Sequence, residues 1–245
     1  MDRFFLSSEQ WAAEVLCLKG EEGHHAVRVM RKKVGDRVEL FDGEGHWVRG
    51  TVREVQRASL KVEPEEEGES HVLVPEVELA VAIPKGKTMD LIIQKAVELG
   101  VSRIQPLVTK NTVVKVSAEE AQEKSLKWQR VALEACKQCG QNFLPQVKVV
   151  SPIGHYLVQG EGVAERTRVI ASLAPGAVPV RQQLEALSDD CEKLSFLVGP
   201  EGDFTAQEVT AALAAGFQPV SLGSIVLRVE TACLSLAAAA RYRFG

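Results

Sequence analysis

The sequence predicts an α/β fold in which helices cover a parallel sheet, preceded by a small β domain. Three observations predict it. Short segments of alternating apolar and polar residues fill the first part of the chain, as in half-buried strands. From residue 75, apolar runs alternate with segments of helical period, which is typical of a parallel sheet. Several of these runs end in glycine turns. The chain has 245 residues, and we expect domains over residues 1–70 and 75–245.

The N-terminal domain is expected to be mostly β. The alternation predicts strands over 38–41, 46–53 and 58–63, joined by tight turns, which indicates a small barrel or sandwich. A short helix is predicted over 23–30. The acidic stretch 63–70 contains Pro and Gly and is interpreted as a linker or exposed loop at the domain boundary.

A cluster of cations follows the short helix. It comprises Arg28, Arg31, Lys32 and Lys33, with no acidic residue between them. One interpretation is a solvated helix end, where cations complement the helix dipole. The other is a phosphate-contacting patch on a domain that is otherwise acidic. The residues alone leave both interpretations open.

The C-terminal domain is expected to contain six strands and the helices between them. Each strand is predicted from a short apolar run, and each helix from 3.6-residue periodicity closed by glycine or another turn residue. The predicted strands are 77–83, 104–108, 146–150, 168–173, 194–198 and 219–222. The predicted helices are 88–99, 118–139, 180–187, 206–215 and 230–241.

Glycine turns close three of these strands, at 173–176, 198–202 and 222–224. Thr205 followed by Glu208 is a capping box, so a helix should start directly after the second turn. In an open parallel sheet, ligands bind at the carboxyl ends of the strands. The three turns together outline a ligand pocket, although each could also be an ordinary connection between a strand and a helix.

Composition and motifs exclude several other classes of protein. The net charge of −4 indicates no general affinity for polyanions. Five scattered cysteines do not indicate a disulfide framework. Cys136 and Cys139 lack a second pair at zinc spacing, so they are interpreted as helix-packing residues and no metal is expected. The Lys-Gly-Lys at 85–87 lacks the spacing of a nucleotide-triphosphate loop, and there is no hydrolase elbow.

No secretory signal or membrane-spanning run is evident from the sequence. We therefore expect a soluble, cytoplasmic protein that does not associate with a membrane.

Several motifs in register resemble a known family. They lie at 24–36, 93–101, 128–140, 199–202 and 222–231. On these motifs the chain resembles the S-adenosylmethionine (SAM)-dependent 16S rRNA uridine-N3 methyltransferases of the RsmE type, in the SPOUT superfamily. The resemblance covers nearly the whole chain.

The resemblance implies a fold and partners that periodicity cannot show. Residues 1–70 would form a PUA-like β-barrel that helps to bind RNA, and residues 75–245 a SPOUT α/β trefoil knot with a parallel sheet. SAM would be the methyl donor, with no metal. The partners would be 16S rRNA in the small ribosomal subunit and a second copy of the chain in a homodimer.

The resemblance also implies roles for particular residues. Arg228 and Glu230 would be catalytic, handling the substrate base or the charge of the donor. The cation cluster would contact RNA. The residues implied to bind SAM are Leu173, Val198, Gly199, Gly202, Leu222, Gly223 and Leu227.

The sequence departs from the family pattern at several positions. Family members usually carry Gly where Asp203 stands. They usually carry Arg at the positions of Asn111, Gln141, Phe143 and Ile225. Two alternatives to rRNA uridine-N3 methylation therefore stay open. One is an RNA-binding protein with this fold but no catalysis, and the other is a SPOUT methyltransferase with a different RNA target.

Overall fold

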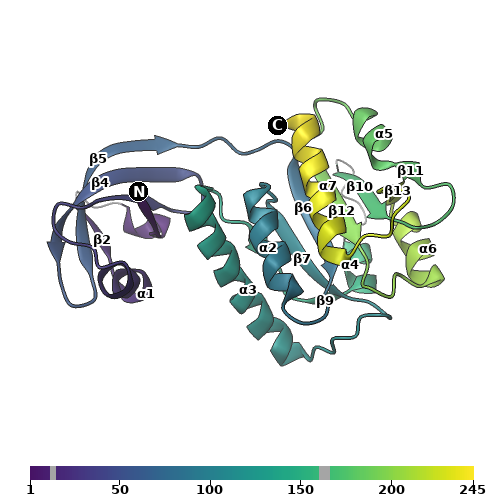
Figure 1. The fold of residues 1–245 in the computed structure, drawn as a ribbon, viewed down its shortest axis with the longest axis horizontal. Helices are drawn as coiled ribbons and strands as arrows, with labels where there is room; N and C mark the ends of the chain where they lie inside the picture. Colours follow the sequence, from purple (N-terminus) through teal and green to yellow (C-terminus); the bar gives the residue numbers. More distant parts are fainter. Residues whose placement is uncertain (12–14, 160–165) are drawn as a thin grey trace. The chain divides into compact units, whose positions relative to one another are not determined.

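The computed structural model describes residues 1–11, 15–159 and 166–245 (Figure 1). The chain divides into two compact units. The first contains residues 1–72 together with 136–144, and the second contains residues 73–135 together with 145–245. Each unit has its own sheet.

The first unit is built on a five-stranded sheet. Its strand order is β1-β3-β4-β5-β2, in which β1 pairs parallel to β3 and the other neighbours pair antiparallel. Two of these strands, β1 and β2, are very short and carry no clear alternation, so the sequence pattern did not reveal them. The strands are β1 (Asp2–Phe5), β2 (Leu16–Leu18), β3 (Arg37–Phe41), β4 (His46–Val55) and β5 (Leu60–Glu69).

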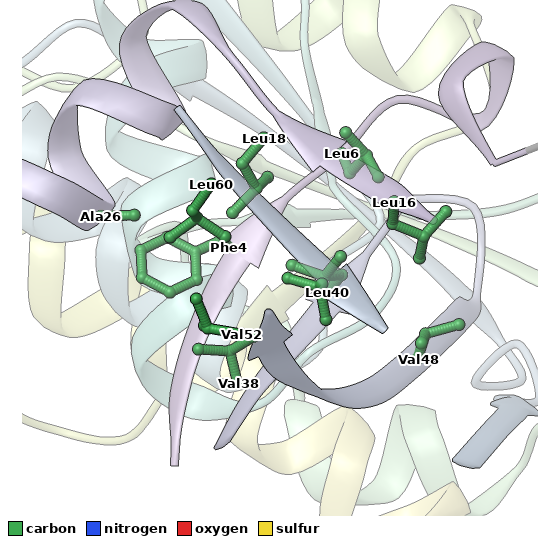
Figure 2. Packing of buried hydrophobic residues seen from close by; sticks show 11 residues of the cluster. Phe4, Leu6, Leu16, Leu18, Ala26, Val38, Leu40, Val48, Val52 and Leu60 are labelled. Carbon is green, nitrogen blue, oxygen red and sulfur yellow. The ribbon is translucent and has the colours of Figure 1, made fainter. Parts of the chain in front are cut away.

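Apolar side chains from all five strands converge on one core (Figure 2). Phe4, Leu18 and Leu40 are almost completely buried there, and Val52 and Leu60 pack beside them. Burying such side chains stabilises the fold by about 1.5–3 kcal/mol each. The small β domain expected from the sequence is thus confirmed.

The prediction of a loop over 63–70 is wrong, because β5 continues to Glu69. The strand pairs with β4 along its whole length, and the register places Glu66 opposite Arg49. Glu66 pairs with Arg49 at 3.2 Å, and Glu63 pairs with Arg53. Opposite charges placed across a strand pair stabilise it. An acidic run looks like a loop in the sequence because its basic partners on another strand cannot be identified there.

The predicted helix over 23–30 is also partly wrong. Helix α1 (Gly20–His24) begins earlier, and a π-helical turn, η2 (His25–Val29), follows it. Gly23 packs closely against the backbone of Leu18, and a Cβ atom at this position would meet the Leu18 carbonyl oxygen at 2.7 Å. A 3-10 turn, η1 (Ser8–Gln10), precedes α1.

Residues 136–144 complete the first unit from the middle of the chain. Arg3 Nη1 donates a hydrogen bond to the Cys136 carbonyl at 2.6 Å. Asn142 Nδ2 donates to Ser70 Oγ at 2.8 Å. The Leu144 backbone N–H donates to the Gly43 carbonyl at 2.9 Å. The first unit is therefore not continuous in sequence.

The second unit is built on a parallel sheet. Its strand order is β11-β13-β10-β12-β6-β7-β8, and β9 also pairs with β7. Every described pairing in it is parallel. The predicted parallel sheet is therefore confirmed. The strands are β6 (Glu76–Ala82), β7 (Arg103–Val108), β8 (Gln146–Val147), β9 (Ser151–Pro152), β10 (Arg166–Ala171), β11 (Val178–Pro179), β12 (Lys193–Val198) and β13 (Gln218–Ser221).

Helices cover this sheet. On one face, α4 and α6 pack against Ala80, Leu107 and Leu197 in an apolar cluster. Helix α7 packs against α2 and against strands β6 and β12 (Figure 1). The helices are α2 (Thr88–Glu98), α3 (Ala118–Cys139), α4 (Ile153–Gln159), α5 (Val180–Glu185), α6 (Ala206–Ala214) and α7 (Val229–Phe244).

Most predicted elements of the second unit are confirmed to within a few residues, but the stretch after α3 differs. The strand predicted over 146–150 is shortened to β8 at 146–147, and a second short strand, β9, follows at 151–152. Helix α4 and strand β11 were not predicted, because two- and seven-residue elements carry too little periodicity.

Candidate functional site

A cavity of about 300 Å³ lies at the carboxyl ends of β10 and β12. Its walls come from the turns that follow these strands and from the segment between β13 and α7. This is the edge of a parallel sheet where ligands usually bind. The lining residues are Ala171, Ser172, Leu173, Val198, Gly199, Pro200, Glu201, Asp203, Leu222, Gly223, Ile225, Val226, Leu227, Arg228, Val229 and Ala232.

The turn after β12 is held by hydrogen bonds. The Asp203 N–H donates to the Pro200 carbonyl at 2.9 Å. Asp203 has a φ of 57°, a conformation that most side chains avoid. Its carboxylate accepts the Phe204 N–H at 2.7 Å. Thr205 is the N-cap residue of helix α6, and the capping box with Glu208 is confirmed. The cap fixes where the turn ends.

A second loop braces this turn from outside the cavity. Asn111 Nδ2 donates to the carbonyl oxygens of Gly202 and Asp203, both at 2.9 Å. Glu208 also accepts the Lys110 N–H at 2.8 Å. The loop after β7 is thereby tied both to the turn and to the start of α6. We call these contacts of Lys110, Asn111 and Glu208 the brace.

The segment before α7 forms the opposite wall. Gly223 has a φ of 119°, which an L-residue seldom adopts, and a Cβ there would meet nothing within 4 Å. Ile225 and Val226 are 76% and 70% exposed. Arg228 is the N-cap residue of α7 and is exposed. Apolar side chains and one guanidinium therefore border the opening.

The structure brings most of the predicted site residues together. Those in the lining are Leu173, Val198, Gly199, Leu222, Gly223, Leu227 and Arg228.

Gly202 and Glu230 are not in the lining. A Cβ at Gly202 would meet the Asn111 Cβ at 3.3 Å, so this position faces the brace. Glu230 lies half-buried in the first turn of α7. Within the described residues, the side chains of Arg228 and Glu230 form no ion pair or hydrogen bond.

Sequence reasoning did not place Glu201, Asp203 or Val226 in the lining. Each neighbours a residue that was placed there, so the turn motif was the available signal. Two carboxylates and one guanidinium give the cavity a mixed charge. With its apolar walls, it suits a ligand that has both an apolar part and a positive charge.

The cation cluster of the first unit is only partly available to a ligand. Arg28, Arg31 and Lys33 are exposed. Lys32 instead pairs with Asp2, and its side chain is 13% exposed. Three of the four cations could therefore contact a phosphate.

The two cysteines of α3 differ. Cys136 is buried, and burial raises its pKa to about 12. Cys139 is exposed. Packing thus explains Cys136 and does not explain Cys139. Over the described ranges, no three His, Cys, Asp or Glu side chains group as metal ligands would. Nor does any helix in those ranges have the length and apolarity to cross a membrane.

Comparison with known proteins decides the family. Residues 72–241 match the RNA methyltransferase domain family, and residues 18–65 match the RNA methyltransferase PUA domain family. The ribosomal RNA small subunit methyltransferase E of Synechocystis is 31% identical over 94% of this chain and 74% of its own length. This chain belongs to the ribosomal RNA small subunit methyltransferase E family.

Solved structures of similar proteins share the fold. A ribosomal RNA small subunit methyltransferase E from Neisseria gonorrhoeae, bound to S-adenosyl methionine, is 30% identical with a TM-score of 0.86. The match covers 98% of this chain and 96% of that one. A methyltransferase from Legionella pneumophila, in complex with SAM, is 28% identical with a TM-score of 0.87 and the same coverage. Family membership therefore extends to both units of the chain.

Proposed function

We propose that this protein transfers a methyl group from SAM to N3 of a uridine in 16S rRNA of the small ribosomal subunit. The observation that carries the proposal is the cavity at the carboxyl ends of β10 and β12, lined by seven of the nine residues expected to bind SAM or act in catalysis. Two similar structures hold SAM, which supports this donor.

The residues present fit SAM. Leu173, Leu222 and Leu227 offer apolar contact to an adenosyl group, and Gly199 and Gly223 allow close approach of the backbone. The carboxylates of Glu201 and Asp203 lie in the same lining and suit a ligand that carries positive charge. When bound, SAM would supply a methyl group on a sulfonium, and its transfer to N3 would release the N3 proton to solvent and leave S-adenosylhomocysteine.

Arg228 is assigned to activation of the base. Uridine N3 carries a proton and is a weak nucleophile until that proton leaves. A guanidinium near O2 or O4 stabilises the negative charge that develops on the ring. Arg228 is exposed at the cavity and has no competing partner among the described side chains. Glu230, two residues further along, is assigned to the charge balance around it. Orientation of the two reactants supplies the rest of the rate enhancement.

RNA binding is assigned to the N-terminal part of the chain. We propose that residues 1–70 form the RNA-binding domain and residues 75–245 the methyltransferase domain. Arg28, Arg31 and Lys33 are exposed cations on the first unit and would contact RNA directly. Lys32 is paired with Asp2 instead. We also propose a homodimer in the cytoplasm.

One observation favours a second candidate function, RNA binding without catalysis. Ile225 lines the cavity and is 76% exposed, where relatives of this type usually carry Arg. Loss of that cation would weaken the hold on RNA near the methyl donor.

The experiment is methylation of unmodified small subunits with labelled SAM, followed by mapping of the modified nucleosides. We expect label at N3 of one uridine. Calorimetry with SAM is run beside it. SAM binding without label at any uridine N3 would overturn the proposed reaction, and absence of SAM binding would favour the second candidate.

A further inference from the structure

A row of polar residues crosses the second sheet near the amino ends of its strands. The register places Arg168 beside Ser195, Ser195 beside Glu78, and Glu78 beside Arg103. Alternation along a strand puts every second residue on the same face. Two residues further on, that face carries Ile170, Leu197 and Ala80, which pack in the apolar cluster with α4 and α6. The covered face thus changes from apolar to polar along the strands.

This row is unusual for its position. Strands of a parallel sheet that is covered on both faces are normally apolar. Here Glu78 is only 6% exposed and Ser195 only 1% exposed. A buried charge is costly unless it is paired and hydrogen-bonded. The partners of Glu78 therefore have to be identified.

Much of the row is satisfied internally. Glu78 accepts hydrogen bonds from Tyr156 Oη at 2.6 Å and from Arg166 Nη1 at 2.9 Å. Arg166 also donates to Ser195 Oγ at 2.9 Å. Burial, together with the Glu78 carboxylate, raises the pKa of Tyr156, so the phenol stays protonated. A structural role accounts for these four residues.

Among the described residues, Arg103 and Lys148 bring more positive charge to the row than Glu78 neutralises. The row borders a cavity of about 240 Å³, whose described lining includes Arg103, Lys148 and Arg166 with Glu78 as its one carboxylate. Arg103 lies 3.6 Å from Glu78, beyond hydrogen-bonding distance. The Lys148 ammonium has no ion pair or hydrogen bond within the described residues. The next row outward adds both an acid and a base, Glu76 and Lys193, so it does not remove the surplus.

We propose that this cavity binds a phosphate group. Planar guanidinium groups match phosphate oxygens in pairs, and an ammonium adds a mobile donor. The cavity is smaller than the roughly 300–1,000 Å³ typical of pockets for drug-sized ligands, which favours a phosphate or a small phosphate ester. The phosphate site lies near the amino ends of the strands, whereas the cavity assigned to SAM lies at their carboxyl ends. It does not depend on the proposed methyl transfer.

The test uses the full-length protein and inorganic phosphate. Calorimetry and thermal unfolding are measured in phosphate and in chloride at equal ionic strength. Phosphate should bind and raise the Tm of the wild-type protein. Lys148→Ala and Arg103→Ala should each weaken phosphate binding about tenfold, as expected when one charged hydrogen bond is lost.

The matched control is Lys115→Ala, which removes an exposed cation that does not line the cavity. It should bind phosphate like the wild type. Circular dichroism checks that each variant folds, and Lys148→Gln replaces Lys148→Ala if that variant does not. Equal phosphate affinity in the wild type, the Lys148 variant and the Lys115 variant would overturn the proposal, as would no binding at millimolar phosphate.

A second arm identifies the source of the phosphate group. A short RNA oligonucleotide is added as a competitor of inorganic phosphate. Displacement that depends on Lys148 would identify an RNA phosphodiester as the ligand. Binding of inorganic phosphate that depends on Lys148 but resists RNA would identify a free anion or small ester. Both results support the site.

Discussion

Asp203 combines an unfavourable backbone conformation with a place in the cavity wall. A left-handed conformation costs an L-residue about 1–2 kcal/mol, which glycine avoids. The Phe204 N–H offsets part of this by donating to the Asp203 carboxylate. A φ of 57° favours glycine, the residue that the family resemblance leads us to expect at this position.

Two replacements of Asp203 separate backbone strain from the side chain. Both Asp203→Gly and Asp203→Ala lose the carboxylate, but only Ala keeps the strain. We expect Asp203→Gly to have a free energy of unfolding about 1 kcal/mol higher than Asp203→Ala, measured by urea denaturation. Gln207, in the first turn of α6, is the control. There the order should reverse, because Ala favours a helix over Gly. Equal stability of the two Asp203 variants would contradict the strain.

Arg228 is the residue on which the proposed chemistry depends. Arg228→Ala should lower kcat by about 10²-fold or more, because a charged hydrogen-bond donor that stabilises the transition state is lost. SAM affinity measured by calorimetry should change little. Arg181→Ala is the control, since Arg181 is exposed on α5 and pairs with Glu185. A kcat within threefold of the wild type, roughly 0.7 kcal/mol, would remove Arg228 from catalysis.

The cysteines of α3 should differ in reactivity. The thiolate is the reactive form, and burial raises the pKa of Cys136 to about 12. We expect an alkylating reagent to label exposed Cys139 in the native protein and Cys136 only after unfolding. Mass spectrometry of digested protein after timed labelling reads out both sites. Similar labelling rates for the two would show that the end of α3 opens readily.

At the scale of elements, the brace joins the loop after β7 to the turn after β12. These segments are about 90 residues apart in sequence, yet Asn111 holds two consecutive carbonyls of the turn. The sequence predicted the turn and the capping box, because both are local. It could not predict the brace, which depends on the order of strands in the sheet.

Asn111→Asp should open this contact. An aspartate cannot donate to the Gly202 and Asp203 carbonyls, and its charge repels them. We expect SAM affinity to fall about tenfold, or roughly 1.4 kcal/mol, by calorimetry. Lys110→Ala is the control, because only its backbone N–H takes part in the brace. Unchanged affinity in Asn111→Asp would show that the turn keeps its shape without the brace.

Strand β5 shows the second limit of local pattern. Leu60 and Val62 alternate and were predicted as strand, whereas Glu65 and Glu66 were not. Glu66 pairs with Arg49 on the neighbouring strand β4, and Glu65 pairs with Arg37 on β3, one strand further across the sheet. Cross-strand pairing can therefore make a strand of residues that look like a linker.

At the scale of the whole molecule, two units were predicted from the change in periodicity near residue 75. The order of the parallel strands was not predictable from local pattern. Strand β6, first in sequence within its unit, lies in the interior of the sheet, and later strands add on both sides. Such an order depends on contacts between distant segments.

The proposed division of labour between the units can be tested with one triple variant. Replacement of Arg28, Arg31 and Lys33 by Ala should weaken RNA binding. It should also make the slope of log K against log salt concentration shallower by about 2–3. SAM affinity should not change, because the cavity belongs to the second unit. Lys61→Ala, which removes a cation paired with Glu54, is the control. An unchanged salt slope would place RNA binding elsewhere.

The contribution of residues 136–144 to the first unit has a consequence for protein synthesis. Arg3 finds Cys136 and Asn142 as partners only after the ribosome has added the whole of α3 and the turn beyond it. The nascent N-terminal segment therefore lacks these contacts while residues 73–135 of the second unit are translated. A recombinant fragment ending at residue 72 would lack the contacts of Arg3 with Cys136 and Asn142 permanently. A chimaera that transplants the first unit should therefore include residues 136–144 together with residues 1–72.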